Sequence, residues 1–568
     1  MGSRGIHHAS ILVILLALGV SGCTPTLTNP DKDFSNPLKG DDNRDPGNGG
    51  GGSGSGGGSG GGSGGSGGSG SGGNSYPGLF TVQIQSPFNQ QSSFEQIVDA
   101  APIEATSHTL YLAKASYYDT QRQEDVMRPA LVLLDHNGDR VTRFGANGEM
   151  VLQLQSGERG EIPKQIALTS THAFILSDVI RFQNNVAWKD IAVTKLNLTS
   201  GLPDPTFGRS GTRIIDIRQT ILGETPTSND HAQAMVLRNG TEITIIGTSN
   251  AKPNSFYFRN FIFFIKINQT DGQVVTSFGT NGMKTNESLS TYTNVSKRFT
   301  VDQVLPLPNG GALVSGRLFY GSASVAYRSR HFIMQFDGQW DYFTPFASYG
   351  MYTYIPSCCI SGGRLFDGVG AMKIFREDDG SIVFAGASQE RDGNGGMLNF
   401  TQIVVDKIDA LGNELPWGPS NASRLYTTTD EETPMSIRSI LKDPSGSDDY
   451  VIQLYPMTQE RLASSFEVIG AEKCAEQAEI SNETHQLRVV SDGSGFDPSF
   501  ATAGTQSISS VILSQKLHPS LLENAGCAAA QKWIQDPFTL ELYSLGFARL
   551  LQPNGTQATA GTISKINW

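Results

Sequence analysis

The chain has 568 residues, of which 38% are hydrophobic and 9% aromatic, so it can bury a sizeable core. Its formal net charge is −12 and no cluster of lysine and arginine stands out. These values argue against nucleic acid as a partner, because nucleic-acid-binding domains carry a basic patch or stripe.

Residues 1–22 predict a signal peptide. Arg4 precedes an apolar run, residues 11–20, which is too short to span a bilayer as a stable helix but suits the hydrophobic region of a signal peptide. The run ends in Val-Ser-Gly-Cys at residues 20–23, which resembles the bacterial lipobox. An ordinary secretory signal that ends at a cysteine by coincidence is the alternative.

The lipobox resemblance implies that Cys23 carries acyl chains such as palmitate and that the mature chain begins there. Two or more acyl chains anchor a protein stably in a membrane, because each buried CH₂ group contributes about 0.8 kcal/mol. The residue after Cys23 is Thr24. Lipoproteins that stay in the inner membrane commonly have an aspartate at this position. We therefore expect an outer-membrane lipoprotein, either periplasmic or surface-exposed.

Residues 23–75 predict a disordered linker. The first half is rich in Pro, Asn and Asp, and residues 47–74 are almost pure Gly and Ser, so too little apolar surface is present for folding. The 28 residues 47–74 are expected to behave as a flexible tether with an end-to-end distance of roughly 30 Å. The segment is expected to let a folded head move away from a lipid surface.

Residues 76–568 read as repeats. A short strand is expected at residues 79–84, and from about residue 94 the chain repeats an apolar strand, a tight turn and an aromatic residue that glycine usually follows. The aromatic residues recur every 63 to 83 positions: Phe144, Phe207, Phe278, Phe346, Trp417 and Phe500. Such a period, filled with short apolar runs and turns, indicates a β-propeller, in which these aromatics are expected to wedge between neighbouring sheets.

The second half of each repeat holds two apolar runs around Asn-Gly or Asp-Gly, as at Asn239-Gly240, Asn309-Gly310 and Asp379-Gly380. These dipeptides favour two-residue hairpins, since both positions tolerate positive φ. Two hairpins per repeat give the four strands of one propeller blade.

We expect an all-β fold with seven four-stranded blades, although six or eight remain open. The strand at residues 79–84 is expected to complete the last blade and close the ring. The predicted units lie near residues 94–150, 162–215, 231–283, 301–351, 368–426, 434–506 and 518–568.

The run "apolar-Asp-x-Asn-Gly … Phe-Gly-x-x-Gly", followed by "apolar-x-Asn/Asp-Gly-x-apolar-apolar-x-Gly", resembles the delta-60 repeat of bacterial surface proteins. The resemblance covers residues 130–426 well, residues 434–506 weakly and the ends poorly. It departs from the family in its longer units and at Ala347 and Ala501, which replace the glycine after the aromatic. The resemblance implies a β-propeller and brings no catalytic residues.

No local motif predicts chemistry, so no catalytic, cofactor or metal residue is assigned. Asp135, Asn137 and Asp139, and likewise residues 377–380, could form calcium loops, but neither segment continues to a closing carboxylate. Solvated hairpin turns explain both segments equally well. Catalytic carboxylates brought together from separate blades would be invisible to this reading.

Four cysteines remain after Cys23, and an even number in an oxidising compartment suggests pairing. Three connectivities are possible. We favour Cys474–Cys527, because both residues belong to the last two blades, which leaves Cys358 and Cys359 as a vicinal pair or free. Four reduced thiols are the alternative.

Two functions fit this sequence. The first is a non-catalytic, membrane-tethered propeller that binds a protein or glycan of the cell envelope. The second is a glycan hydrolase or lyase with acids converging from several blades. Recognition residues are expected in the long connections 216–231, 283–301, 352–368 and 455–486, which hold the exposed-looking Tyr292, Tyr354 and Arg461.

Overall fold

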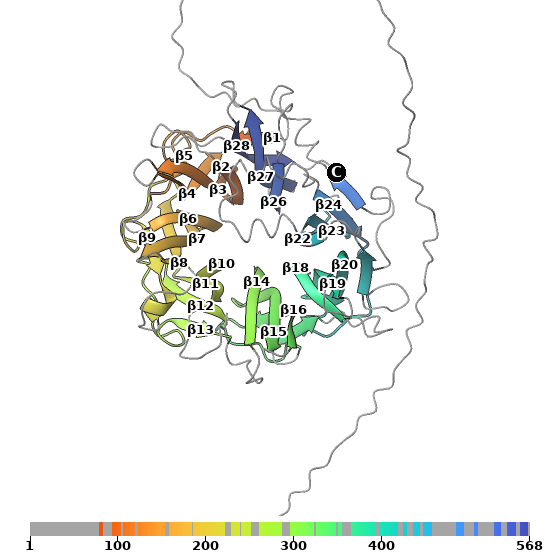
Figure 1. The fold of residues 1–568 in the computed structure, drawn as a ribbon. Helices are drawn as coiled ribbons and strands as arrows, with labels where there is room; N and C mark the ends of the chain where they lie inside the picture. Colours follow the sequence, from red (N-terminus) through yellow and green to blue (C-terminus); the bar gives the residue numbers. More distant parts are fainter. Residues whose placement is uncertain are drawn as a thin grey trace, which may run out of the picture. The chain divides into compact units, whose positions relative to one another are not determined.

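The fold is drawn from a computed structural model of the chain (Figure 1). All the residues that it describes belong to one compact unit, Ser71–Trp568. They are residues 79–82, 94–103, 106–119, 123–153, 158–183, 186–221, 229–238, 240–250, 261–286, 296–322, 325–347, 350–354, 365–391, 397–417, 424–428, 435–443, 447–456, 484–493, 505–508, 528–535, 542–551 and 557–565.

The described strands form seven four-stranded antiparallel sheets, which Figure 1 shows as blades around a ring. The first blade has β2 (Phe94–Ile103), β3 (His108–Asp119), β4 (Glu124–Leu134) and β5 (Glu149–Val151). The second has β6 (Glu158–Leu168), β7 (His172–Gln183), β8 (Val186–Asn197) and β9 (Thr212–Ile215). The third has β10 (Asp230–Arg238), β11 (Glu242–Ser249), β12 (Phe261–Asn268) and β13 (Met283–Thr285).

The remaining blades repeat this order. The fourth has β14 (Ser296–Pro306), β15 (Ala312–Ser322), β16 (Val325–Phe336) and β17 (Met351–Tyr354). The fifth has β18 (Leu365–Arg376), β19 (Ile382–Arg391), β20 (Met397–Ile408) and β21 (Arg424–Thr428). The sixth has β22 (Met435–Lys442), β23 (Tyr450–Pro456), β24 (Thr484–Val489) and β25 (Thr505–Ile508). The predicted seven-bladed propeller is confirmed.

The seventh blade combines both ends of the folded unit. Its own strands are β26 (Ala528–Gln535), β27 (Leu542–Leu551) and β28 (Gln557–Lys565), and the fourth is β1 (Leu79–Val82). β1 runs antiparallel to β28, with Phe80 opposite Ile563 and Thr81 opposite Thr562. This exchange is the one expected from the sequence, since closing the ring requires the last blade to take a strand from the other end of the chain.

Each blade packs against the next, and β22 contacts β26 at the last junction. The first strands of the blades, such as β10, β14 and β18, lie nearest the centre of the ring (Figure 1). Each first strand has a register shift against its neighbour: Ile97/Asp99, Pro163/Gln165, Ala232/Ala234, Val301/Gln303, Val369/Lys373, Ile437/Ser439 and Ala530/Lys532. Such bulges bend the strand and redirect side chains.

Some polar side chains beside these bulges reach the next blade. Asp99 Oδ2 accepts a hydrogen bond from Ile166 N at 3.0 Å, and Asp302 Oδ2 accepts one from Met372 N at 3.0 Å. Each bond joins the first strand of one blade to the first strand of the following blade. Carboxylates such as those of Asp99 and Asp302 thus have a structural role between blades. A buried aspartate in this ring is therefore not by itself a sign of a functional site.

The repeat aromatics form the core between blades, as predicted. Five of the six lie in the described residues and are buried: Phe144, Phe207, Phe278, Phe346 and Trp417. Phe144, for example, packs with Leu131 of its own blade and Ile175 of the next. Phe500 lies outside the described residues. The aromatic repeat therefore reports interblade packing, not a ligand surface.

One sequence-based expectation is wrong. The sequence predicts an exposed recognition residue at Tyr354, but this residue lies at the end of β17 and is 1% exposed. Its ring contacts Phe384 of the next blade at 5.8 Å between centroids. Tyr354 belongs to the fourth strand of its blade and packs against the neighbouring blade. It is therefore buried, although the sequence places it in a connection.

The described part of the chain contains a single π-helical turn, η1 (Ile217–Ile221), between the second and third blades. In the same residues, none of the helices has the length and apolar character needed to cross a membrane.

Candidate functional site

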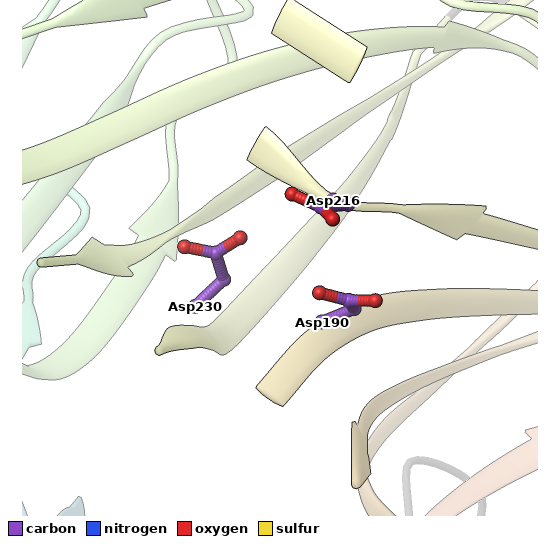
Figure 2. A group of neighbouring side chains, drawn as sticks. All are labelled: Asp190, Asp216 and Asp230. Atoms are coloured by element: carbon purple, nitrogen blue, oxygen red, sulfur yellow. The ribbon is translucent and has the colours of Figure 1, made fainter. Parts of the chain in front are cut away.

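Three buried aspartates meet where the second blade passes to the third. Asp190 lies on β8, Asp216 directly follows β9, and Asp230 is the first residue of β10. Each offers a carboxylate oxygen, and these oxygens all lie within 4.8 Å of one another. Figure 2 shows the three side chains converging on one place. We call Asp190, Asp216 and Asp230 the acidic cluster.

Pairing between the backbones of two blades brings the acidic cluster together. An isolated parallel bridge pairs Lys189 with Asn229, so the residues that follow them, Asp190 and Asp230, lie side by side. Asp216 ends the second blade just before the π-helical turn η1. Asp216 and Asp230 thus stand at the two ends of the connection 217–229, and Asp190 faces them from β8.

The carboxylates differ in how well they are hydrogen-bonded. Asp230 Oδ1 accepts from Ser249 Oγ at 2.6 Å and its Oδ2 from Ile217 N at 3.0 Å. Asp216 Oδ1 accepts from Gln219 N at 2.9 Å. Among the described residues, no donor meets Asp216 Oδ2 or Asp190 Oδ1 with hydrogen-bond geometry, although the Trp188 side chain lies close enough to Asp190 to act against its raised pKa. Buried polar atoms are rarely left unsatisfied, so these two oxygens require an explanation.

The cluster is enclosed and strongly negative. Asp190 and Asp230 are 0% exposed and Asp216 is 5% exposed. Burial and the nearby Asp216 raise the pKa of Asp190 to about 8, although Arg181 acts in the opposite direction. Arg181 Nε lies 2.9 Å from Asp190 Oδ2 and is the cation paired with the cluster.

A neighbouring aspartate shows the opposite situation. Asp178 on β7 is fully buried, but Lys164 Nζ lies 3.2 Å and His231 Nδ1 3.3 Å from its Oδ2. Its Oδ1 accepts from Ala232 N at 2.8 Å, which ties β7 to β10. Burial opposes ionisation, yet Lys164 and His231 hold the pKa of Asp178 below its usual value. Asp178 is a satisfied structural carboxylate, in contrast to the acidic cluster.

The two calcium-loop candidates are built as turns. Asp135 Oδ1 accepts hydrogen bonds from the backbone amides of Asn137 and Asp139, both at 2.9 Å. In the other segment, Asp379 Oδ1 accepts from Ser381 N and Ser381 Oγ, while Glu377 binds Tyr450 and Lys442 of the next blade. The carboxylates of Asp135 and Asp379 thus serve the turns, and that of Glu377 serves an interblade contact.

Several sequence predictions concern residues outside the described part of the chain. They are the lipidation of Cys23, the linker 23–75, the Cys474–Cys527 disulfide, the vicinal Cys358 and Cys359, and the recognition residues Tyr292 and Arg461. They stay predictions.

Sequence reasoning missed the acidic cluster, because its members are 14 to 40 positions apart and belong to two blades. One signal was present. Asp216 interrupts the run Ile-Ile-Asp-Ile at residues 214–217, and a carboxylate inside an apolar strand end is seldom buried without a partner. A search for such isolated acids would have found one member of the cluster.

Comparisons with known proteins give no family and only distant structural similarity. No family model matches the chain, and no curated protein matches its sequence. The polysaccharide lyase Uly1 is similar with a TM-score of 0.37 at 8% identity, over 87% of this chain and 89% of that one. The extracellular domains 1–2 of Drosophila Semaphorin 1a give a TM-score of 0.36 at 10% identity, over 86% and 88%.

The β-propeller domain of the Trilobed protease from Pyrococcus furiosus gives a TM-score of 0.33 at 7% identity, over 84% of this chain and 97% of that one. Likenesses this distant carry no argument about the activity of this chain.

Proposed function

We propose that the chain is a lipid-anchored β-propeller that binds a protein or glycan of the cell envelope without chemical turnover. The position of β1 carries the proposal. This strand directly follows the Gly/Ser-rich segment and completes the seventh blade through its pairing with β28. The predicted tether would therefore join the folded unit at the strand that closes the ring. The whole propeller would then be attached to the membrane through this one strand.

A closed ring suits binding because it presents connections between blades on a rigid scaffold. The connections between strands vary in length: 286–295 and 355–364 hold ten residues each, 216–229 holds 14, 509–527 holds 19 and 457–483, inside the sixth blade, holds 27. The strands that they join keep the same order in every blade. Variation confined to connections is the pattern expected where recognition, and not the scaffold, distinguishes one repeat from another.

The alternative, a glycan-active enzyme, requires acids that converge and that a sugar can reach. The acidic cluster meets the first requirement, since Asp190 and Asp230 come from different blades. It does not suit the second, because its members are at most 5% exposed. A sugar ring is far larger than the space between oxygens within 4.8 Å of one another. We therefore favour binding over hydrolysis or elimination.

Two expectations from the sequence support a binding partner in the cell envelope. They are the resemblance to delta-60 surface proteins and the predicted location at the outer membrane. Cys23→Ser should release the protein from membranes while the propeller still folds, as judged by its circular dichroism. A Cys23→Ser protein that still fractionates with the outer membrane would contradict the anchoring part of the proposal.

The binding part is tested with the purified chain on isolated envelope material. Shortening the connections 355–364 and 457–483 one at a time should abolish retention by either the protein or the glycan fraction, with unchanged thermal stability. The same samples are assayed for soluble oligosaccharide products. Product release that disappears in a carboxylate variant would establish the enzyme and overturn the binding proposal.

A further inference from the structure

We propose that the acidic cluster, Asp190, Asp216 and Asp230, binds a calcium ion between the second and third blades. The oxygen geometry fits this ion. Calcium–oxygen distances of about 2.3–2.6 Å place oxygens on opposite sides of the ion about 4.6–5.2 Å apart. The cluster's oxygens, all within 4.8 Å of one another, can share such an ion. Magnesium prefers shorter distances, about 2.0–2.1 Å, and near-ideal octahedral geometry, whereas calcium accepts more flexible coordination.

Two buried oxygens without hydrogen bonds point independently to a ligand. Asp190 Oδ1 and Asp216 Oδ2 meet no donor with hydrogen-bond geometry among the described residues, although both side chains are at least nine-tenths buried. Leaving a buried acceptor unsatisfied destabilises a fold by about 1–3 kcal/mol, and more when it is charged. A cation between these oxygens would satisfy both of them. Water and backbone carbonyls commonly fill the remaining positions around calcium.

The charges suit a divalent ion. With all three carboxyl groups ionised, the cluster carries three negative charges, and Arg181 Nε lies 2.9 Å from Asp190 Oδ2. Because the cluster is buried, its negative charge is costly, and a divalent cation between the oxygens would neutralise much of it.

The cluster also has an anchoring role in the fold. Ile217 N donates to Asp230 Oδ2 and Gln219 N to Asp216 Oδ1, so the start of the connection 217–229 is already tied to both acids. A calcium ion would join the two ends of this connection to Asp190 on β8. The bound ion would therefore stabilise the junction of the second and third blades.

The test uses the whole chain, purified in mild detergent and stripped with a chelator. Titration calorimetry with calcium chloride should find a site that binds one ion and that requires the cluster. The melting temperature should rise by a few degrees at a calcium concentration of about 100 times the Kd. Asp190→Asn and Asp216→Asn should each weaken this binding about tenfold or more, because ligand charge sets calcium affinity.

The calcium-free proteins separate this proposal from a purely structural role. Asp216→Asn without calcium should melt at or above the temperature of the calcium-free wild type, because a neutral amide replaces one carboxyl group of a crowded acidic cluster and its Oδ1 can still accept from Gln219 N. If Asp216 were purely structural, the substitution would instead lower the melting temperature. Such a lower melting temperature, with calcium binding retained, would overturn the proposal.

Asp139→Asn is the matched control. Asp139 is an exposed acid in the first-blade turn, so its loss should leave calcium binding unchanged. Four results would contradict the proposal: no heat or melting shift in the wild type up to millimolar calcium, binding that survives both cluster substitutions, loss of binding in Asp139→Asn, or an equal response to magnesium.

Discussion

The backbone amide of Gly145 donates a hydrogen bond to the carbonyl of Ser200, 2.9 Å away in the next blade. The same contact recurs one blade later, between Gly208 N and Asp271 O at 2.9 Å. The residue after the repeat aromatic thus joins each of these blades to its successor. Gly145 and Gly208 have φ values of 56° and 57°, in the left-handed region that favours glycine. The Phe-Gly pair in the repeat therefore marks this contact between blades.

Gly145→Ala should destabilise the propeller by more than about 2 kcal/mol. A left-handed conformation costs a non-glycine residue about 1–2 kcal/mol, and the added Cβ would lie 2.1 Å from the carbonyl oxygen of Glu149. Gly240→Ala is the control, since Gly240 has φ 67° but nothing within 4 Å of the added Cβ. Urea unfolding should show the larger loss for Gly145→Ala, and equal losses would mean that the close approach is unimportant.

Trp340→Gly should destabilise the junction between the third and fourth blades by about 2–3 kcal/mol. Trp340 has φ 62° and occupies the turn position that Gly412 holds in the fifth blade. Relief of the left-handed strain would return about 1–2 kcal/mol. The buried indole, 2% exposed and 5.2 Å from the ring of Phe264, is worth about 3–5 kcal/mol, so packing outweighs strain.

Trp340→Phe keeps the φ and much of the ring volume, and should cost less than half of that amount in the same denaturation experiment. If Trp340→Gly were instead the more stable of the two variants, backbone strain would dominate at this turn and the packing argument would be wrong.

The blades could be predicted from sequence because their signals are local. Asn-Gly and Asp-Gly turns, the recurring aromatic and the left-handed glycine each act within a few residues. Even Ala347, which lacks the glycine of the repeat, keeps φ 47° and donates from its amide to Leu411 O at 2.6 Å. There the interblade contact imposes a conformation that the sequence alone would not assign to alanine.

The acidic cluster could not be predicted in this way. Asp190 and Asp230 become neighbours only through the parallel bridge between Lys189 and Asn229, which depends on how two blades dock. The burial of Tyr354 was missed for the same reason, because Phe384 comes from the following blade. Contacts between blades, more than those within a repeat, decide where the buried charges and rings lie.

His331 should make the fifth-blade junction sensitive to acid. Its Nε2 lies 2.7 Å from Ala387 O and it is 0% exposed, and burial lowers its pKa to about 4. The unfolded chain binds the proton from about pH 6.5 downward and the folded chain only near pH 4. The stability from neutral His331 is therefore complete above about pH 6.5 and decreases by about 3 kcal/mol as the pH falls to about 4.

Urea unfolding at pH 7 and pH 4 measures this loss. The wild type should lose about 3 kcal/mol more than His331→Gln over that range. His136→Gln, at an exposed turn histidine, should follow the wild type. A His331→Gln variant with the same pH dependence as the wild type would show that this histidine does not bind a proton on unfolding.

The pairing of β1 with β28 closes the ring, and only every second backbone N–H group of β1 should take part in it. Along an antiparallel strand, successive N–H groups point alternately toward and away from the partner. Phe80→Pro and Thr81→Pro, which lie opposite Ile563 and Thr562 in β28, should therefore differ sharply. The proline that removes the inward-pointing N–H leaves a β28 carbonyl without its partner and should cost about 1–3 kcal/mol, while the other is tolerated on this edge strand. Hydrogen exchange of the β28 amides and the melting temperature report the outcome, and two equally tolerated prolines would mean that β1 does not hold the ring closed.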